Sequence, residues 1–221
     1  GPHKLTSETG EEILAHTVII STGASAKWLG IPSEQTFMNK GVSACAVCDG
    51  FFFRGMDVAI VGAGDSAAEE ALYLSKLCTK VHMLVRRDEM RASKIMQERV
   101  LAADNIEIHW NTETKEIIGG DEVEGVKVFN NKTKEIHTLD VKGFFVAIGH
   151  TPNTDLFKGT LDMDDTGYLI TKPGSTKTNV EGVFASGDAQ DSVYRQAITA
   201  AGTGCMAALD AERYLTEKGI I

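Results

Sequence analysis

The stretch Val58-Ala59-Ile60-Val61-Gly62-Ala63-Gly64-Asp65-Ser66-Ala67 decides the fold. Its apolar first part predicts a short buried strand, and the glycines that follow predict a tight turn into a helix. The first glycine permits the turn, the second lets the backbone approach a pyrophosphate, and the small Ala67 lets the helix pack closely on the strand. We therefore expect a dinucleotide-binding turn, with the N–H groups of the helix N-terminus and the Ser66 hydroxyl as donors to phosphate.

The residues after this turn complete an α/β unit. The expected elements are, in order, a helix over 69–77, a strand over 81–85, a helix over 91–101 and a strand over 106–110. Residues 113 to 147 alternate as antiparallel strands do, with Gly119-Gly120-Asp121 and Asn130-Asn131 as turns. These strands form a layer inserted before a closing strand over 144–148. The fold class is therefore α/β, a Rossmann-like domain with inserted antiparallel strands.

The residues before this unit predict part of a second one. They begin with a polar, hairpin-like piece and continue to an apolar strand over 17–20, which ends at the turn Ser21-Thr22-Gly23-Ala24. Residues 31–44 show little periodicity and predict a segment that crosses between two packed units.

The residues after the unit return to the second one. The break Gly149-His150-Thr151-Pro152-Asn153 marks a boundary. Beyond it we expect a strand over 182–186 that ends at Gly187-Asp188, and a long alanine-rich helix over 195–216.

Composition limits the possible partners. A chain of 221 residues with 43% hydrophobic content can bury a substantial core. Its 31 acidic and 22 basic side chains give a net charge of −9, which disfavours nucleic acid and anionic membranes as partners. The longest apolar runs are far shorter than the roughly 20 residues that cross a bilayer, so we expect a soluble chain.

The chain has four cysteines, Cys45, Cys48, Cys78 and Cys205. They are too few for a secreted scaffold stapled by disulfides, and the first residues carry no signal pattern, so we expect the cytoplasm. A zinc site needs further ligands at paired spacing, which Cys78 and Cys205 do not offer, so we expect no metal site in the chain. Cys78 and Cys205 are expected to be packing residues.

The stretch Cys45-Ala46-Val47-Cys48-Asp49-Gly50 is the candidate catalytic motif. Two cysteines separated by two residues can close a disulfide that exchanges through a mixed-disulfide intermediate. The charge of Asp49 opposes thiolate formation, so its expected role is to shuttle a proton as the disulfide opens and closes. The alternative is that Asp49 only begins the turn with Gly50.

Arginines follow the second expected strand, where a dinucleotide site distinguishes NAD from NADP. Arg86, Arg87 and Arg91 fit bidentate recognition of a 2′-phosphate and predict NADPH. The alternative is a solvated basic patch at a helix start. Because nicotinamide delivers a hydride that a disulfide does not readily accept, a mediator is needed, and a flavin is the usual one.

Together these motifs resemble the low-molecular-weight thioredoxin reductases. The resemblance covers essentially the whole chain and rests on six motifs in order: 44–50, 62–67, 86–92, 149–153, 187–188 and Tyr194-Arg195-Gln196-Ala197. It implies an NADPH domain over 43–149, which carries the dithiol, and parts of a Rossmann-like FAD domain over 1–42 and 150–221. The boundaries are then hinges about which one domain turns.

The resemblance also implies residue roles, a substrate and an assembly. Ile148 and Tyr168 match positions that contact NADP. The implied FAD site comprises Thr22, Gly23, Ala24, Gly187, Asp188, Arg195, Gln196 and Ala197. In it, Asp188 forms a hydrogen bond with the ribityl chain of the flavin. The implied activity is NADPH-dependent reduction of the disulfide of thioredoxin through FAD, Cys45 and Cys48. The implied assembly is a homodimer.

The chain departs from the family pattern at two places. Val85 stands where the family often has His before the paired arginines. No glycine-rich FAD fingerprint precedes Cys45. We therefore expect a truncated form that binds NADPH, holds FAD poorly and does not complete turnover alone.

Two other functions remain open from the residues. The chain fits a reductase of another disulfide protein, such as a peroxiredoxin. It also fits a non-catalytic NADP-binding module, which unreactive cysteines would favour. The sequence does not decide which of Cys45 and Cys48 attacks the partner and which faces the flavin.

Overall fold

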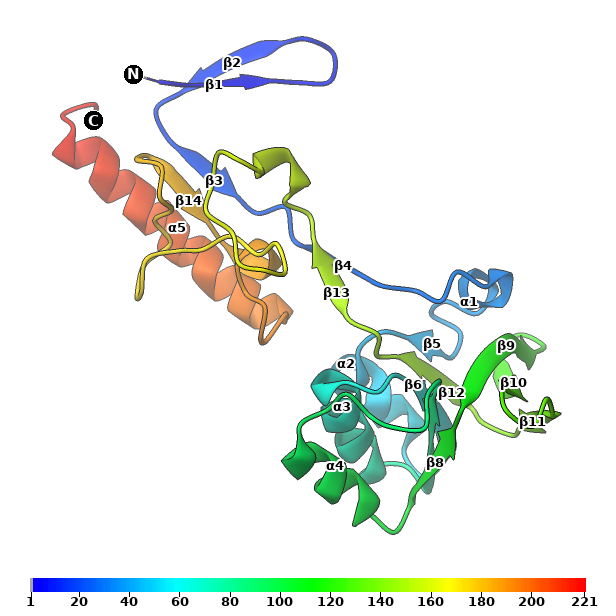
Figure 1. The fold of residues 1–221 in the computed structure, drawn as a ribbon. Helices are drawn as coiled ribbons and strands as arrows, with labels where there is room; N and C mark the ends of the chain where they lie inside the picture. The colour runs from blue at the N-terminus through cyan, green and yellow to red at the C-terminus, as the bar shows by residue number, and fades with distance from the viewer. Residues whose placement is uncertain (1) are drawn as a thin grey trace. The chain divides into compact units, whose positions relative to one another are not determined.

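A computed structural model describes residues 2–221 and divides the chain into two compact units (Figure 1). The central unit is Ala26–Gly149. The flanking unit combines the described residues up to Ser25 with His150–Ile221.

The central unit is built on a five-stranded sheet in the order β5-β12-β6-β7-β8. These strands are Val42–Ser43 (β5), Gly143–Val146 (β12), Asp57–Val61 (β6), Lys80–Val85 (β7) and Ile106–Trp110 (β8). All four strand pairs are parallel. The predicted α/β fold of Rossmann type is therefore confirmed.

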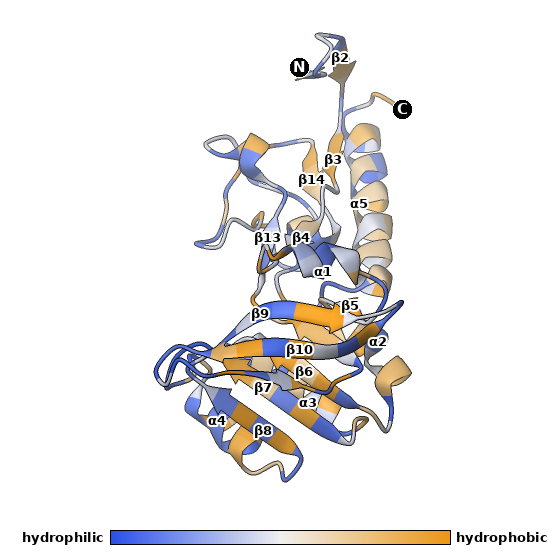
Figure 2. Cartoon of the chain, turned by 90° about the vertical axis from the view of Figure 1, so that its right-hand side faces the viewer, coloured by the Kyte–Doolittle hydropathy of each residue, from blue (hydrophilic) through white to orange (hydrophobic). Residues whose placement is uncertain are grey.

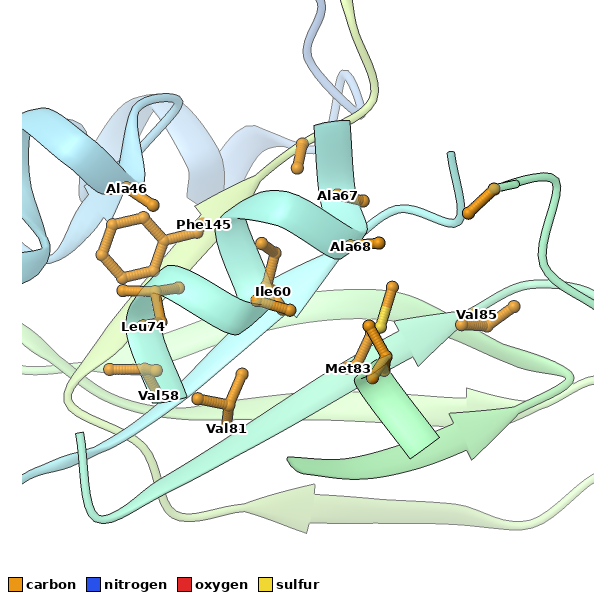
Figure 3. Close-up of a cluster of buried hydrophobic side chains, with 14 of the residues drawn as sticks. Ala46, Val58, Ile60, Ala67, Ala68, Leu74, Val81, Met83, Val85 and Phe145 are labelled. Atoms are coloured by element: carbon orange, nitrogen blue, oxygen red, sulfur yellow. The ribbon is translucent and has the colours of Figure 1, made fainter. Parts of the chain in front are cut away.

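Two helices pack on one face of this sheet, α3 (Asp65–Ser75) and α4 (Lys94–Leu101). Helix α3 buries Ala67, Ala68, Ala71 and Leu74, which share one helical face, against Val58, Ile60 and Phe145 (Figure 3). Helix α3 begins four residues before its expected start because Gly64 adopts an extended conformation at the N-cap. Helix α4 begins three residues after its expected start, because Arg91 and Ala92 bond back to Ala63.

A three-stranded antiparallel layer packs on the opposite face, in the order β11-β10-β9. Its strands are Thr112–Gly119 (β9), Val123–Asn130 (β10) and Ile136–Leu139 (β11). Their inward residues share a core with Ala59, Leu84 and Phe144 of the parallel sheet. Figure 2 shows polar and apolar residues interspersed along β10, the pattern expected of antiparallel strands in this layer.

The crossing segment predicted over 31–44 instead belongs to the central unit. Helix α1 (Pro32–Thr36) is held to β9, because Ile117 N–H donates to Ser33 Oγ at 2.9 Å. Glu34, only 2% exposed, accepts from Leu29 N–H and Gly30 N–H. Such buried contacts leave weak periodicity in the sequence. The central unit therefore begins at Ala26, earlier than the expected boundary at residue 43.

The flanking unit contains the expected hairpin and helix. Strands β1 (His3–Thr6) and β2 (Glu12–Ala15) pair antiparallel, and β3 (Val18–Ile20) pairs parallel with β14 (Val183–Ala185). Helix α5 (Ala197–Glu217) packs Ala207 and Ala211 on Phe184. Strand β4 (Ala24–Ala26) pairs with β13 (His150–Pro152) where the chain passes between the units.

Short helices complete the secondary structure: α2 (Ala46–Asp49) and the 3₁₀ turns η1 (Gly50–Phe53), η2 (Asp155–Phe157) and η3 (Gly187–Ala189). Among residues 2–221, none of the helices combines the length and the hydrophobicity needed to cross a bilayer.

Candidate functional site

The two cysteines of the central unit form a disulfide, Cys45–Cys48. Cys45 is the N-cap of α2, and its sulfur accepts a hydrogen bond from Cys48 N–H at 3.2 Å. Cys48 is exposed and Cys45 is half-buried. The two cysteines predicted from spacing are therefore joined in a disulfide, and this disulfide is accessible to an external thiol.

A hydroxyl links Asp49 to the disulfide. Ser43 Oγ donates to Asp49 Oδ2 at 2.6 Å and accepts from Cys45 N–H at 3.0 Å. Ser43 is buried at the end of β5, so its position is fixed by the sheet. A carboxylate and a hydroxyl in contact beside a disulfide can hold and pass a proton. Sequence reasoning found Asp49 but missed Ser43; the polar residue after Val42 was the available signal.

Helix α3 supports the redox motif. Ala46 N–H donates to Glu70 Oε2 at 3.2 Å, and Ala46 packs in the same core as Leu74. A Cβ at Gly50 would lie 3.0 Å from Leu74 Cδ2, so glycine lets the end of α2 approach α3 closely. One helix therefore carries the glycine turn at its N-terminus and holds the cysteine helix by its side.

The glycine turn has the geometry that the sequence predicted. A Cβ at Gly62 would meet Ala147 O and lie 2.6 Å from the Ala67 Cβ, so only glycine fits. A Cβ at Gly64 would enter open space. The backbone at Gly64 is thus accessible at the start of α3, where N–H groups favour an anion. Ser66 lies exposed in the first turn of α3.

A cavity of about 240 Å³ lies beside this turn in the central unit. It brings together five of the predicted cofactor residues, Gly62, Arg86, Arg87, Arg91 and Ile148. Its lining also includes Leu29 and Glu89, which sequence reasoning did not single out. No sequence pattern marked Leu29, which lies between the expected strand over 17–20 and the segment over 31–44.

Two pairs of hydrogen bonds hold the loop that carries Arg86, Arg87 and Arg91, the arginine loop, to the glycine turn. Arg91 N–H and Ala92 N–H both donate to Ala63 O, at 2.7 and 3.0 Å. Asp65 accepts from the N–H and the Oγ of Ser93, and these hydrogen bonds lower the pKa of its carboxyl. The loop is therefore anchored by its backbone, which leaves the exposed guanidiniums available to a ligand.

The candidate flavin residues all belong to the flanking unit. Thr22, Gly23 and Ala24 follow β3, and Gly187-Asp188 follows β14. Because β3 and β14 are parallel, their carboxyl ends lie at one edge, and Ser21 Oγ lies 2.7 Å from Ser186 Oγ there. In open α/β sheets this edge is the usual place for a ligand.

Asp188 carries a buried carboxylate oxygen, Oδ1, that has no hydrogen-bond partner among the described residues. Burial and the neighbouring Asp191 raise the pKa of the Asp188 carboxyl. A buried acceptor without a donor is costly in the free protein. A ligand hydroxyl would supply that donor, so Asp188 fits the hydroxyl-rich group that the sequence analysis assigned to it.

The loop before α5 is fixed by Asp191, which accepts from the N–H groups of Val193, Tyr194 and Arg195. Arg195 has φ 47°, and Gln196 forms a capping box with Thr199. The helix therefore begins at Ala197 rather than at residue 195, with Arg195, Gln196 and Ala197 at its N-terminus.

Tyr168 does not line this cavity. It is buried in the flanking unit, where its N–H donates to Asp164 Oδ1 at 3.0 Å, whereas the cavity belongs to the central unit. Its contact with NADP stays a prediction.

Comparisons with known proteins identify the family. The sequence pattern of the pyridine nucleotide-disulphide oxidoreductases matches residues 2–204. The thioredoxin reductase of Rickettsia conorii is 54% identical over 219 residues, which are 98% of this chain and 71% of the relative. The chain belongs to the thioredoxin reductase family.

Solved thioredoxin reductases have the same fold. The enzyme from Giardia duodenalis superposes with a TM-score of 0.92 at 44% identity, over 97% of this chain and 71% of that one. The enzyme from Streptococcus pyogenes MGAS5005 gives a TM-score of 0.91 at 41% identity, over 96% and 69%. The resemblance seen in the motifs is thus confirmed for the family, and the chain is related to oxidoreductases throughout its length.

Proposed function

We propose that this chain takes part in the NADPH-dependent reduction of the thioredoxin disulfide, through FAD and the Cys45–Cys48 pair. One observation carries the proposal: a closed, accessible disulfide and an arginine-lined cavity beside the glycine turn belong to one compact unit, and α3, which follows that turn, contacts the cysteine helix. The relatives named thioredoxin reductase support the substrate.

The arginines are proposed to select NADPH. Arg86, Arg87 and Arg91 line the cavity with the glycine turn, so a pyrophosphate at the N-terminus of α3 brings the 2′-phosphate toward them. Guanidinium groups bind phosphate through paired hydrogen bonds. NADH has no 2′-phosphate and cannot form these bonds. Ile148 also lines the cavity and adds an apolar side chain to its wall.

The flanking unit is proposed to hold FAD through residues 22–24, Gly187-Asp188 and 195–197. The unpaired oxygen of Asp188 and the exposed N-terminus of α5 fit a ligand rich in hydroxyls and hydrogen-bond acceptors. When bound, a flavin supplies the means to pass the two electrons of a hydride on to a disulfide.

The cysteine pair is proposed to pass those electrons to thioredoxin. The closed Cys45–Cys48 bond takes up two electrons and two protons and becomes two thiols. One thiolate then attacks the thioredoxin disulfide, and the mixed disulfide is resolved by the other, which restores the Cys45–Cys48 bond and leaves thioredoxin with two thiols. Asp49, bonded to Ser43, exchanges the protons.

Apolar surface beside the disulfide supports a protein partner. Val47, Phe51 and Phe52 are 56%, 63% and 73% exposed, on α2 and η1 next to the cysteines. Exposed aromatic side chains are typical anchors in protein interfaces. We assign this surface to thioredoxin. A cytoplasmic location and a homodimeric assembly belong to the same proposal.

The test uses the cysteine pair directly. The protein is reduced with dithiothreitol, freed of reductant and mixed with oxidised thioredoxin, and the thiols of both proteins are counted by mass spectrometry after alkylation. We expect thioredoxin to become reduced as Cys45–Cys48 closes, and a Cys45→Ser or Cys48→Ser variant to stop at a mixed disulfide. Transfer to an unrelated disulfide protein at the same rate would argue for another reductase, and unreactive cysteines would contradict the proposal.

A further inference from the structure

A second cluster of polar side chains lies on the parallel sheet, away from the residues assigned above. In β7, Val81, Met83 and Val85 point toward the helices, whereas Leu84 packs in the core shared with the antiparallel layer. His82 lies between Val81 and Met83 in the strand, so its side chain points to the opposite face, toward the antiparallel layer. On the edge strand β8, Ile106, Ile108 and Trp110 also pack toward the helices.

The remaining residues of β8, Glu107 and His109, therefore lie on the same face as His82. His82 pairs directly with Glu107 across the two strands, and His109 pairs with Leu84, two residues further along β7. Strand pairing alone thus gathers two imidazoles and a carboxylate at the edge of the sheet.

The distances within this cluster are short. His82 Nδ1 lies 2.9 Å from His109 Nε2. Glu107 Oε1 lies 3.5 Å from His109 Nε2, and Glu107 Oε2 lies 3.9 Å from His82 Nδ1. One ligand atom from each residue falls within 4.8 Å of the others.

These separations match the edges of a tetrahedral metal site. With metal–ligand bonds of about 2.0–2.1 Å, two ligands of tetrahedral zinc lie about 3.3 Å apart. The separations of His109 Nε2 from His82 Nδ1 and from Glu107 Oε1, 2.9 and 3.5 Å, lie on either side of that value, whereas the 3.9 Å separation belongs to the other carboxylate oxygen, Oε2. A small rotation of the Glu107 carboxylate would bring one of its oxygens toward an ion held by the two imidazoles.

The environment favours neutral imidazole. His82 is buried and His109 is half-buried, and burial lowers the pKa of both rings, that of His109 to about 4. Neutral imidazole is the form that binds metal. His137 of β11 lies beside the cluster, its ring centroid 6.2 Å from that of His109.

We propose that His82, Glu107 and His109 bind one divalent transition-metal ion of the zinc class, with water at the remaining position. Two imidazoles and a carboxylate are a donor set that zinc accepts. Such an ion ties the edge strand β8 to β7, the strand that leads into the arginine loop. Cysteine spacing does not mark this cluster; its sequence signal is alternation, which places Glu107 and His109 on one face of a strand.

Lys80 bonds one of the proposed ligands. Its Nζ bonds Glu107 Oε2 at 2.6 Å, which lowers the pKa of the Glu107 carboxyl. A metal ion must displace this ammonium group from the carboxylate. Because Lys80 is partly exposed, it can turn out to solvent when it is displaced.

The test measures zinc binding to the full chain in a Cys45→Ser/Cys48→Ser background, so that the paired thiols bind no metal. Zn²⁺ is titrated in competition with a chromophoric chelator. We expect one Zn²⁺ per chain, and His109→Gln and Glu107→Gln each to weaken binding at least about tenfold. His16→Gln, an exposed histidine of the flanking unit, is the matched control and is expected to bind as tightly as the parent.

Two further measurements keep the result clear if a histidine variant folds poorly. Zn²⁺ is expected to raise the melting temperature of the parent by more than that of Glu107→Gln, a variant expected to fold because the Glu107 side chain is half exposed. Lys80→Met is expected to bind Zn²⁺ several-fold more tightly, because the competing ammonium is gone. Absence of saturable binding, or binding that survives both Glu107→Gln and His109→Gln, would overturn the proposal.

Discussion

Ser43 and Asp49 are joined by a 2.6 Å hydrogen bond beside the Cys45–Cys48 disulfide. Ser43 belongs to the end of a sheet strand and Asp49 to the end of the cysteine helix. The proton-accepting group is thus oriented by the rigid sheet, which is how a positioned acid or base becomes effective.

Asp49→Asn is expected to slow thioredoxin reduction by the reduced cysteine pair about 100-fold, because an amide does not exchange the proton. Ser43→Ala is expected to slow it less, since the carboxylate remains but loses its oriented donor. Both rates are measured by stopped-flow thiol exchange over a range of pH. Asp104→Asn, in an exposed turn, is the control. An unchanged pH profile in Asp49→Asn would remove Asp49 from the mechanism.

Glu70 is expected to stabilise the cysteine helix through Ala46 N–H. Glu70→Leu removes that acceptor and is expected to lower the free energy of unfolding by about 1–3 kcal/mol, the cost of an unsatisfied donor. Glu70→Gln keeps an acceptor and is expected to cost less. Urea denaturation measures both. Equal losses in the two variants would show that the carboxylate charge matters and the hydrogen bond does not.

The arginines are expected to determine cofactor preference. An Arg86→Ala/Arg87→Ala variant loses charge-assisted bonds to the 2′-phosphate and is expected to bind NADPH about 10- to 100-fold more weakly while its affinity for NADH stays the same. Calorimetric titration with both nucleotides measures the ratio. Lys127→Ala, a partly exposed cation of β10 that does not line the cavity, is the control. Equal weakening toward both nucleotides would assign the arginines a general electrostatic role.

The remaining two cysteines are expected to react differently. Cys78 is buried, and burial, assisted by the charge of Asp57, raises the pKa of its thiol to about 11, whereas Cys205 is exposed. At pH 8 Cys78 is therefore protonated and shielded, so we expect iodoacetamide to label Cys205 in the native protein and Cys78 only after unfolding. Peptide mapping by mass spectrometry reports the two sites. Rapid native labelling of Cys78 would contradict its burial.

Local pattern predicted most of the central unit. Apolar runs and the glycine turn predicted β6, α3 and β7, and alternation predicted the antiparallel layer, because each of these signals depends on near neighbours in the chain. Residues 26–42 escaped prediction since their place is fixed by distant partners, such as the Ile117 N–H that bonds Ser33. Ser43 and the His82 cluster escaped for the same reason, because strand pairing brings their members together.

The two glycines of the nucleotide turn provide the last prediction. A Cβ at Gly62 would meet Ala147 O and the Ala67 Cβ, so Gly62→Ala is expected to lower the free energy of unfolding by about 1–3 kcal/mol, as overpacking does. A Cβ at Gly64 would enter open space, so Gly64→Ala is expected to cost less than about 1 kcal/mol. Yet Gly64→Ala is expected to abolish NADPH binding, because its methyl group lies where the pyrophosphate approaches the backbone.

Urea denaturation and calorimetric titration of the same two proteins separate these effects. If Gly64→Ala stays stable but loses NADPH binding, Gly64 contacts the ligand. If Gly62→Ala loses stability, Gly62 shapes the fold. Gly120→Ala, in an exposed hairpin turn where a Cβ also meets nothing, is the control for both measurements. Normal NADPH affinity in Gly64→Ala would mean that the pyrophosphate does not lie on this turn, and the arginine cavity would then need another ligand.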